Sequence, residues 1–333
     1  MERGPGMTRR SRRGWADAEA ARVLDEVLAS VGGRAALRGR GRLRRVGRGL
    51  TYEVFGTDCS LPGEGGTEGR WVVVRVPHHD AGPDQPELAR REAALLARLA
   101  TSSFPLRLPR VLGTATSCHG VAMVQEHVDG VPVEFRARRA LVPPWDVAAE
   151  AAAHCHAVPP GLVADLLPSH GTRRGHVEAR LAELTEDLPE GLPEVAEAAA
   201  WVRAHLPPAE PARLLHGDLL GQNLLLSLEG EPLGVVDWAF AELGDPANDL
   251  AVMTRGAARP FQDAGGREKL LAAYNARAED PLTPRDLALQ DLLFAAGSYV
   301  CEAEEHGADS VSVVNVRNQL AAALRRAECA GGG

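Results

Sequence analysis

Apolar residues recur at helical spacing in two stretches of the first third of the chain. In residues 16–31 they fall on one side of a helix, and a glycine pair ends the pattern. Residues 86–100 begin with a proline in the first turn and repeat apolar positions three and four residues apart, with charges on the other side. Each stretch predicts an amphipathic helix.

Strand-forming residues dominate the sequence between these two stretches. In residues 43–55 they alternate with polar positions around two glycines, and residues 71–76 form a nearly continuous β-branched run. We expect two neighbouring antiparallel strands here. The connecting residues 56–69 contain five glycines and a proline, which predicts a long exposed loop. A further strand is expected over residues 121–128.

Helical patterns prevail after residue 130. They cover residues 145–156, 175–187, 192–205, 266–278, 284–304 and 311–328. Two short apolar runs, 224–228 and 234–238, interrupt them and predict a β-hairpin around Glu229-Gly230-Glu231. The whole pattern predicts an α+β protein with a small β-rich first lobe and a larger, mainly helical second lobe.

The length of 333 residues favours two lobes over one. We expect the first lobe over residues 15–128 and the second over 129–328. Residues 1–14 contain five arginines and one glutamate, which predicts a disordered basic tail, and residues 329–333 are expected to be a flexible tail.

Composition and charge exclude several classes of protein. Aromatic residues are only 4% of the chain, and the first 150 residues keep almost no net charge once the basic tail is set aside, so nucleic-acid binding is not expected. No apolar run is long enough for a membrane span or a secretion signal, which predicts a cytoplasmic protein without a membrane partner. The five cysteines show no C-x-x-C spacing and are expected to be free thiols.

The strongest chemical signal lies in residues 214–226, LLHGDLLGQNLLL. His216-Gly217-Asp218 is followed five positions later by Asn223, on a loop that leads into an apolar strand. This spacing matches the catalytic loop of kinases, in which the aspartate accepts the proton of the substrate hydroxyl and the asparagine binds a metal ion. The alternative is that these residues cap turns.

Two further aspartate motifs follow this loop. Asp237 comes nineteen residues after Asp218 at the end of an apolar run, where a carboxylate can bind Mg²⁺. In the segment GDPANDL, Asp245 precedes a proline and a helical run, which is typical of a helix N-cap. Asp249 in the same segment is expected to accept hydrogen bonds that hold the catalytic loop.

Taken together, HGD-x-x-x-x-N, the D-W pair and GDP-x-x-DL resemble the motifs of the aminoglycoside phosphotransferase family of small-molecule kinases. The resemblance covers roughly residues 40–300. It implies a protein-kinase-like bilobal fold. It also implies transfer of the γ-phosphate of ATP or GTP, with Mg²⁺, to a hydroxyl of a small molecule. Because the acceptors of this family include antibiotics, the resemblance also suggests a role in antibiotic resistance. The oligomeric state stays open between a monomer and a weak dimer.

The resemblance also implies a role for individual residues. In the second lobe Asp218 is the expected catalytic base, Asn223 and Asp237 are the metal ligands, and His216 supports the loop. In the first lobe the expected nucleotide-binding residues are Gly47 and Gly49 in a loop over the phosphates, Glu92 as partner of a strand cation, and the main chain of Glu126 and Val128 at the nucleobase. A plain turn, an exposed helix charge and a simple interdomain connection remain the respective alternatives.

Arg75 departs from the family pattern, because the family usually has lysine at that place in the strand. Arginine keeps the charge but is bulkier and presents a planar fork. Arg75 is therefore expected to pair with Glu92 and contact phosphate. The alternative is a nucleotide-binding module with little turnover. A protein-serine kinase is disfavoured, since Asp245 follows Asp237 by only eight positions and no anchor for a peptide-binding segment appears.

The acidic second half bears on the acceptor. Residues 151–333 contain 14 basic and 27 acidic residues. Four of the acidic residues cluster late in the chain, after residues 284–300 of the expected helix, in the part where aminoglycoside-modifying relatives place acidic substrate contacts: Glu302, Glu304, Glu305 and Asp309. This predicts a cationic, aminoglycoside-like acceptor. Solvated helix faces are an equally good explanation of the excess charge.

Overall fold

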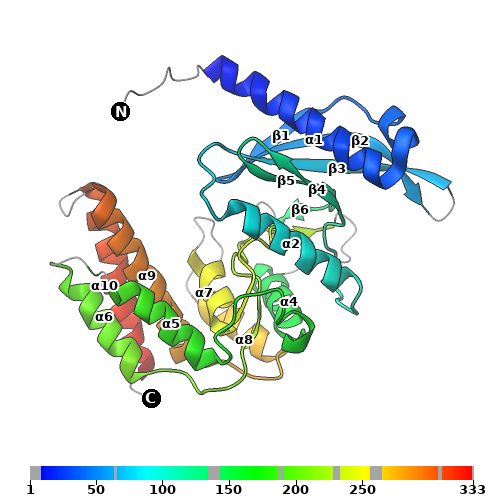
Figure 1. The fold of residues 1–333 in the computed structure, drawn as a ribbon. Coiled ribbons are helices and arrows are strands. Elements are labelled where there is room, and N and C mark those ends of the chain that lie inside the picture. Colours follow the sequence, from blue (N-terminus) through cyan, green and yellow to red (C-terminus); the bar gives the residue numbers. More distant parts are fainter. Residues whose placement is uncertain are drawn as a thin grey trace. The chain divides into compact units, whose positions relative to one another are not determined.

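A computed structural model describes residues 9–63, 66–133, 143–186, 188, 191–227, 233–255, 265–306 and 310–331. The chain divides into two compact units, unit 1 over Met1–Asp129 and unit 2 over Gly130–Gly333. Unit 1 is rich in β-structure and unit 2 is mainly helical (Figure 1), which confirms the predicted fold class.

Unit 1 is built on one antiparallel sheet of five strands in the order β1-β2-β3-β5-β4. Its elements along the chain are α1 (Arg9–Arg38), β1 (Arg44–Arg48), β2 (Tyr52–Gly63), β3 (Gly66–Pro77), α2 (Gln85–Ala100), β4 (Val111–Ser117) and β5 (Gly120–Glu126). The first helix begins at Arg9, so it includes residues that the sequence analysis placed in a basic tail.

The alternation of β3 explains how the two helices are placed on this sheet. Val72, Val74 and Val76 share a buried core with α1. Arg75 points to the opposite face, because successive side chains of a strand alternate, and there it meets Glu92 of α2. The helices α1 and α2 therefore cover opposite faces of the sheet (Figure 1).

The prediction of a long exposed loop over residues 56–69 is wrong. Strands β2 and β3 continue through this segment, where Cys59 pairs with Arg70 and Leu61 with Glu68. Cys59 and Leu61 are each 1% exposed and pack in the α1 core. The alternation of these two residues with polar neighbours is typical of a strand, but the prediction gave more weight to the glycine content of the segment. Strand β4 was not predicted, and residues 43–55 form two strands rather than one.

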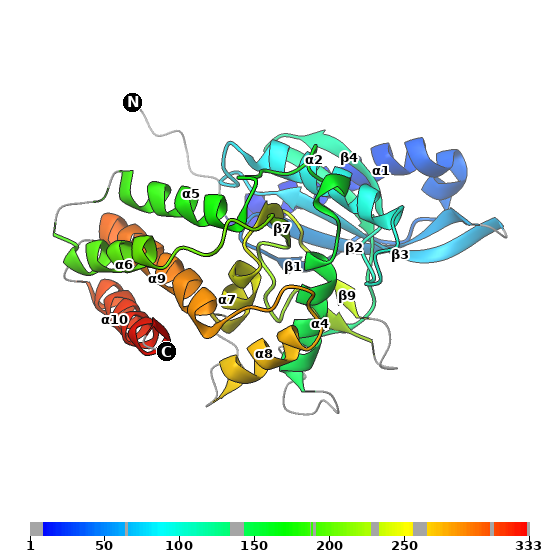
Figure 2. The same cartoon turned by 90° about the horizontal axis from the view of Figure 1, so that it is seen from below.

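Unit 2 contains two groups of helices. Its elements are β6 (Val131–Pro132), α4 (Pro144–His156), η1 (Pro160–Leu162), α5 (Arg173–Glu186), α6 (Pro193–Ala204), β7 (Arg213–Leu215), β8 (Leu224–Leu226), β9 (Gly234–Val235), β10 (Glu242–Gly244), α7 (Ala247–Arg255), α8 (Gly266–Asn275), α9 (Pro284–His306) and α10 (Val311–Gly331). Helices α5, α6, α9 and α10 lie side by side in both views (Figures 1 and 2) and share one apolar core that includes Val195, Leu292 and Leu320. Helix α4 packs against α7 and α8.

The short strands of unit 2 hold the predicted catalytic loop. Strand β7 pairs with β10, and β8 pairs with β6 and β9. The β8–β9 hairpin agrees with the prediction, while its turn residues 229–231 lie outside the described residues. Helix α10 runs to Gly331, so residues 329–331 are helical. Every helix in the described part of the chain is too short or too polar to cross a membrane.

Candidate functional site

The loop between β7 and β8 is held by one carboxylate from α7. Asp249 accepts hydrogen bonds from the backbone N–H groups of His216 (2.8 Å) and Gly217 (2.9 Å). It also contacts His156 Nε2 at 3.2 Å, and His156 Nδ1 lies 2.8 Å from the hydroxyl of Tyr274. Burial alone would raise the pKa of Asp249, but the hydrogen bond and charge of His156 hold it below its usual value. A charged Asp249 thus fixes the start of the loop.

His216 orders the loop through both ring nitrogens. Nε2 lies 3.1 Å from the Val236 carbonyl and Nδ1 accepts a hydrogen bond of 3.3 Å from the Asp218 N–H, which requires the neutral ring with its proton on Nε2. Burial lowers the pKa of His216, which also favours the neutral ring. The ring packs against Trp238 with 4.6 Å between centroids. This geometry suits positioning of Asp218 rather than proton transfer.

Gly217 occupies a position that no side chain fits. Its φ is 81°, in the left-handed region that favours glycine. A Cβ added there would lie 2.0 Å from the carbonyl oxygen of Phe240. The glycine of the HGD motif therefore lets the loop pass close to the segment that follows Asp237.

Asp218 and Asn223 are brought together on this loop. Asn223 is 5% exposed, and its Nδ2 donates to the carbonyl oxygen (2.8 Å) and to Oδ2 (3.0 Å) of Asp218. Burial, followed by repulsion from Asp237, raises the pKa of Asp218 to about 6, against the lowering effect of the Asn223 hydrogen bond. The carboxyl of Asp218 is thus poised to change protonation just below neutral pH.

Asp237 has an unusual backbone. Its φ is 70°, and it is the only non-glycine residue with positive φ in the described part of the chain. The preceding residue, Val236, donates its N–H to the Asn223 carbonyl at 3.0 Å and accepts from His216. Such conformations cost about 1–3 kcal/mol and concentrate at functional sites. The sequence placed Asp237 at a strand end but carried no signal for this conformation.

The residues around Asp218 fit a magnesium ion by their chemistry. The carboxylate of Asp237 and the amide of Asn223 are hard oxygen donors, and a cation would offset the repulsion between Asp218 and Asp237. No group of three or more His, Cys, Asp or Glu side chains arranged to bind a metal occurs among the described residues. Any remaining ligands would then be phosphate oxygens and water, which Mg²⁺ commonly keeps.

Asp245 belongs to a buried ionic cluster beside this loop. It accepts hydrogen bonds of 2.8 Å from Arg173 Nε and from Gln290 Nε2. Arg173 also pairs with Glu210 and Asp286. The Ala247 N–H reaches Asp245 Oδ1 at 3.4 Å, so the carboxylate also lies at the start of α7. Sequence reasoning missed Arg173 and His156 as partners, because their contacts join segments far apart in the chain.

In unit 1, Arg75 and Glu92 form the predicted ion pair. Arg75 Nη1 donates to Glu92 Oε1 at 2.6 Å, and both side chains are buried, with 8% and 1% of their surfaces exposed. The Arg75 guanidinium also lies 4.4 Å from the ring centroid of Tyr52. The arginine side chain is therefore fixed on the α2 face of the sheet and does not point to solvent.

The other predicted nucleotide-binding residues lie in strands of the same sheet or directly after them. Gly47 is at a register shift between β1 and β2, and Gly49 donates its N–H to the Tyr52 carbonyl at 2.9 Å in the turn. Glu126 ends β5, and its N–H donates to the Arg110 carbonyl at 2.9 Å. Val128 is 8% exposed.

Comparison with known families decides the class of protein. The family model described as "Phosphotransferase enzyme family" matches residues 64–287, about two thirds of the chain. The chain belongs to this phosphotransferase family. The family resemblance and the enzyme class expected from the sequence are thereby confirmed.

Solved structures of similar proteins show that the chain has the fold of these phosphotransferases. The phosphotransferase superposes on a mutant of the aminoglycoside 2'-phosphotransferase-IIIa solved as its GDP complex, with a TM-score of 0.63, 16% identity and coverage of 90% of this chain and 95% of that one. For a macrolide 2'-phosphotransferase type I the TM-score is 0.58, with 20% identity and coverage of 91% and 97%. Acyl-CoA dehydrogenase family member 10 of Mus musculus is 38% identical over 61 residues, which are 18% of this chain and only 6% of that protein.

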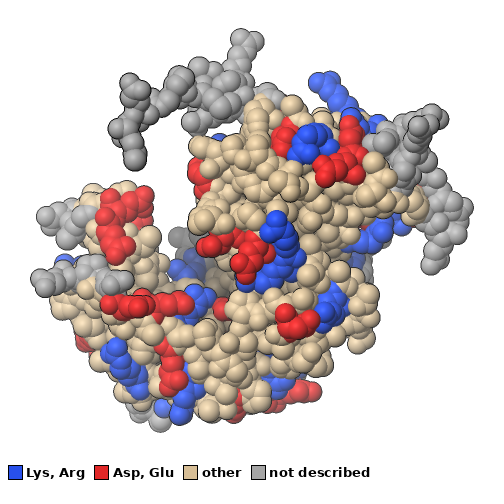
Figure 3. Space-filling model, viewed as in Figure 1, with Lys and Arg blue, Asp and Glu red and all other residues tan. Residues whose placement is uncertain are grey.

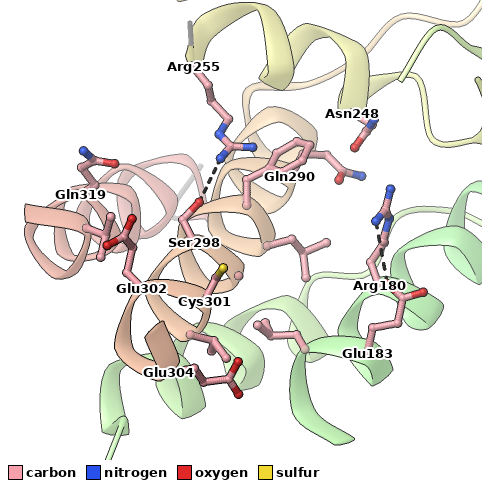
Figure 4. Close-up of a pocket in the computed structure, with 16 residues that line it drawn as sticks. Arg180, Glu183, Asn248, Arg255, Gln290, Ser298, Cys301, Glu302, Glu304 and Gln319 are labelled. Atoms are coloured by element: carbon pink, nitrogen blue, oxygen red, sulfur yellow. Dashed lines mark hydrogen bonds and ion pairs between the residues drawn. The ribbon is translucent and has the colours of Figure 1, made fainter. Parts of the chain in front are cut away.

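Unit 2 of the phosphotransferase contains a cavity of about 770 Å³ between α5, α7, α9 and α10 (Figure 4). Glu302 and Glu304 line it, whereas Glu305 is not among its lining residues and Asp309 lies outside the described residues. Acidic side chains also gather over the helices at the left of Figure 3. Asn248 lines the cavity and directly precedes Asp249, which links the cavity to the loop of Asp218.

Proposed function

We propose that this phosphotransferase moves the γ-phosphate of ATP or GTP to a hydroxyl group of a small molecule. The observation that carries the proposal is the carboxyl of Asp218, held at 3.0 Å by Asn223 and raised in pKa to about 6 beside Asp237. A base with a pKa just below the working pH is ionised at pH 7 and retains the strongest basicity compatible with ionisation.

Asp218 would accept the proton of the attacking hydroxyl. Asn223 uses its amide nitrogen on Asp218, so its amide oxygen and the carboxylate of Asp237 would hold Mg²⁺. The ion, when bound, would neutralise charge on the transferring phosphate. Asp249 and the neutral His216 would keep the loop in place, and Asp245 would support the start of α7.

The nucleotide would use residues of unit 1. Arg75, oriented by Glu92 at 2.6 Å, would contact phosphate through the N–H groups of its fork. The turn around Gly47 and Gly49 would lie over the phosphates, and the main chain of Glu126 and Val128 would meet the base. The GDP complex of the similar aminoglycoside phosphotransferase supports a purine nucleotide as donor, with ATP and GTP as the candidates.

The acceptor would bind in the cavity of unit 2. A volume of about 770 Å³ is within the ~300–1,000 Å³ usual for small-molecule sites. Glu302 and Glu304 at its wall favour a cationic group such as the amines of an aminoglycoside-like antibiotic. Modification of such a compound would confer antibiotic resistance.

The proposal is tested by nucleotide consumption in the presence of a panel of hydroxylated small molecules, each assayed with ATP and with GTP. We expect acceptor-dependent release of nucleoside diphosphate by the wild-type protein, and its loss in Asp218→Asn. Asp17→Asn, which removes an exposed carboxylate of α1, is the matched control and should keep full activity.

The same assay distinguishes this function from the alternative, a nucleotide-binding module with little turnover. If saturable nucleotide binding occurs but no acceptor stimulates nucleotide consumption, the alternative is correct. Acceptor-dependent turnover that survives in Asp218→Asn would instead remove Asp218 from the chemistry.

A further inference from the structure

One cation in the unit 2 cavity has an unusual environment. Arg255, the last residue of α7, donates from Nη2 to the Ser298 hydroxyl at 3.1 Å (Figure 4). Its guanidinium carbon lies 4.1 Å from the ring centroid of Phe294. Ser298 and Phe294 both belong to α9 and both line the cavity.

Arg255 forms no ion pair with an acidic residue in the described part of the chain. The other arginine of the cavity, Arg180, pairs with Glu242 at 2.9 Å, and Arg267 of α8 pairs with Asp291. Desolvation by the surrounding protein lowers the pKa of Arg255, and no carboxylate of the described residues offsets this effect. The cavity therefore contains a positive charge that has no carboxylate in ion-pair contact among the described residues.

The contacts of Arg255 determine which of its N–H groups remain available to bind a ligand. Phe294 covers a face of the guanidinium plane, and Ser298 takes one N–H group of Nη2. The remaining N–H groups point outward in the plane of the fork, the arrangement that binds a carboxylate with two parallel hydrogen bonds.

We propose that Arg255, Ser298 and Phe294 form an anion subsite of the acceptor cavity, and that the acceptor carries a carboxylate in addition to its hydroxyl. Because Glu302 and Glu304 line the same cavity with opposite charge, the acceptor is a zwitterion, such as a hydroxylated amino acid or an amino sugar acid. That the occupant is the acceptor rests on the proposed function; that the subsite binds a carboxylate does not.

The test uses four sugars that differ only in charged groups: glucose, glucosamine, glucuronic acid and 2-amino-2-deoxyglucuronic acid. Binding of each to the full chain is measured by isothermal titration calorimetry without nucleotide. We expect 2-amino-2-deoxyglucuronic acid to bind most tightly of the four, and glucuronic acid to bind more tightly than glucose.

Three variants assign the effect to side chains. Arg255→Ala should weaken both carboxylated sugars at least ~10-fold, because hydrogen bonds to charged groups are lost, and leave glucosamine unchanged. Arg255→Lys, which keeps the charge without the fork, should fall between wild type and Arg255→Ala. Arg203→Ala removes an exposed arginine of α6 as the matched control and should alter binding less than twofold.

The results separate this inference from the proposed function. The anion subsite is overturned if neither carboxylated sugar shows saturable, Arg255-dependent binding, or if Arg255→Ala and Arg203→Ala have equal effects while both remain folded by circular dichroism. A binding pattern that follows Arg255 supports the subsite even where no sugar stimulates nucleotide consumption. Loss of phosphotransfer in Asp218→Asn with unchanged sugar binding supports both.

Discussion

Replacing Asp218 by Asn should stabilise the protein while it strongly lowers turnover. Burial and Asp237 raise the pKa of Asp218 from 3.8 to about 6, so the ionised carboxylate is disfavoured in the folded state. This shift corresponds to about 3 kcal/mol at 1.36 kcal/mol per pKa unit. Because the carboxyl is partly exposed, solvent screening reduces the expected gain to about 1–2 kcal/mol.

The pH dependence gives the sign of the effect. A carboxyl whose folded pKa is raised contributes stability that is fully present below the unfolded pKa of 3.8 and is lost as the pH rises through about 6. The wild-type protein is therefore destabilised by Asp218 at pH 8 and less so at pH 5. The advantage of Asp218→Asn should fall to about half between pH 8 and pH 5.

The assay is urea unfolding of both proteins at the two pH values, without nucleotide or Mg²⁺, with the free energy extrapolated linearly to water. Turnover in the same variant should fall by ~10²–10⁴, while nucleotide affinity changes little. The assigned pKa and its cause would be refuted if the variant were less stable than wild type at pH 8. They would also be refuted if its gain in stability over wild type were the same at both pH values.

Three further results are expected. Asp237→Ala should weaken Mg-nucleotide binding, since it removes a charged oxygen ligand; unchanged titration of Mg-nucleotide would argue against that role. Arg75→Ala should raise the nucleotide KM while Arg75→Lys remains active, and wild-type kinetics of Arg75→Ala would contradict contact with phosphate. Gly217→Ala should lower the free energy of unfolding by at least about 2 kcal/mol, because it combines a left-handed φ with a clash at the Phe240 carbonyl. Gly161→Ala, where a Cβ meets no atom within 4 Å, is its control in the same unfolding assay, and equal losses in both would disprove the steric argument.

The loop that joins Asp218 and Asn223 was predictable from the sequence because its signal is local. The spacing of Asp218 and Asn223 is fixed by the chain, and the structure joins them at 3.0 Å. The buried partners Arg173 and His156 were not accessible, since they meet Asp245 and Asp249 across 72 and 93 positions. Periodicity reports which face of a helix is buried but not which polar side chain lies opposite.

The fold shows the same division between local and distant information. Helix α1 extends seven residues beyond each end of the predicted stretch 16–31, whereas the other predicted helices have their ends within three residues of the prediction. The β2–β3 ribbon was mistaken for a loop, because pairing between Cys59 and Arg70 is decided by cross-strand contacts and by cover from α1. Local glycine and proline preferences contain no information on that cover.

The left-handed backbone of Asp237 limits how this position can change during evolution. Only glycine, asparagine and aspartate adopt such a φ readily, so most substitutions would disturb the folded loop as well as the site. Asparagine is the one neighbour that preserves both shape and backbone while it discards the negative charge. Inactive descendants that remain folded should therefore pass through Asp237→Asn.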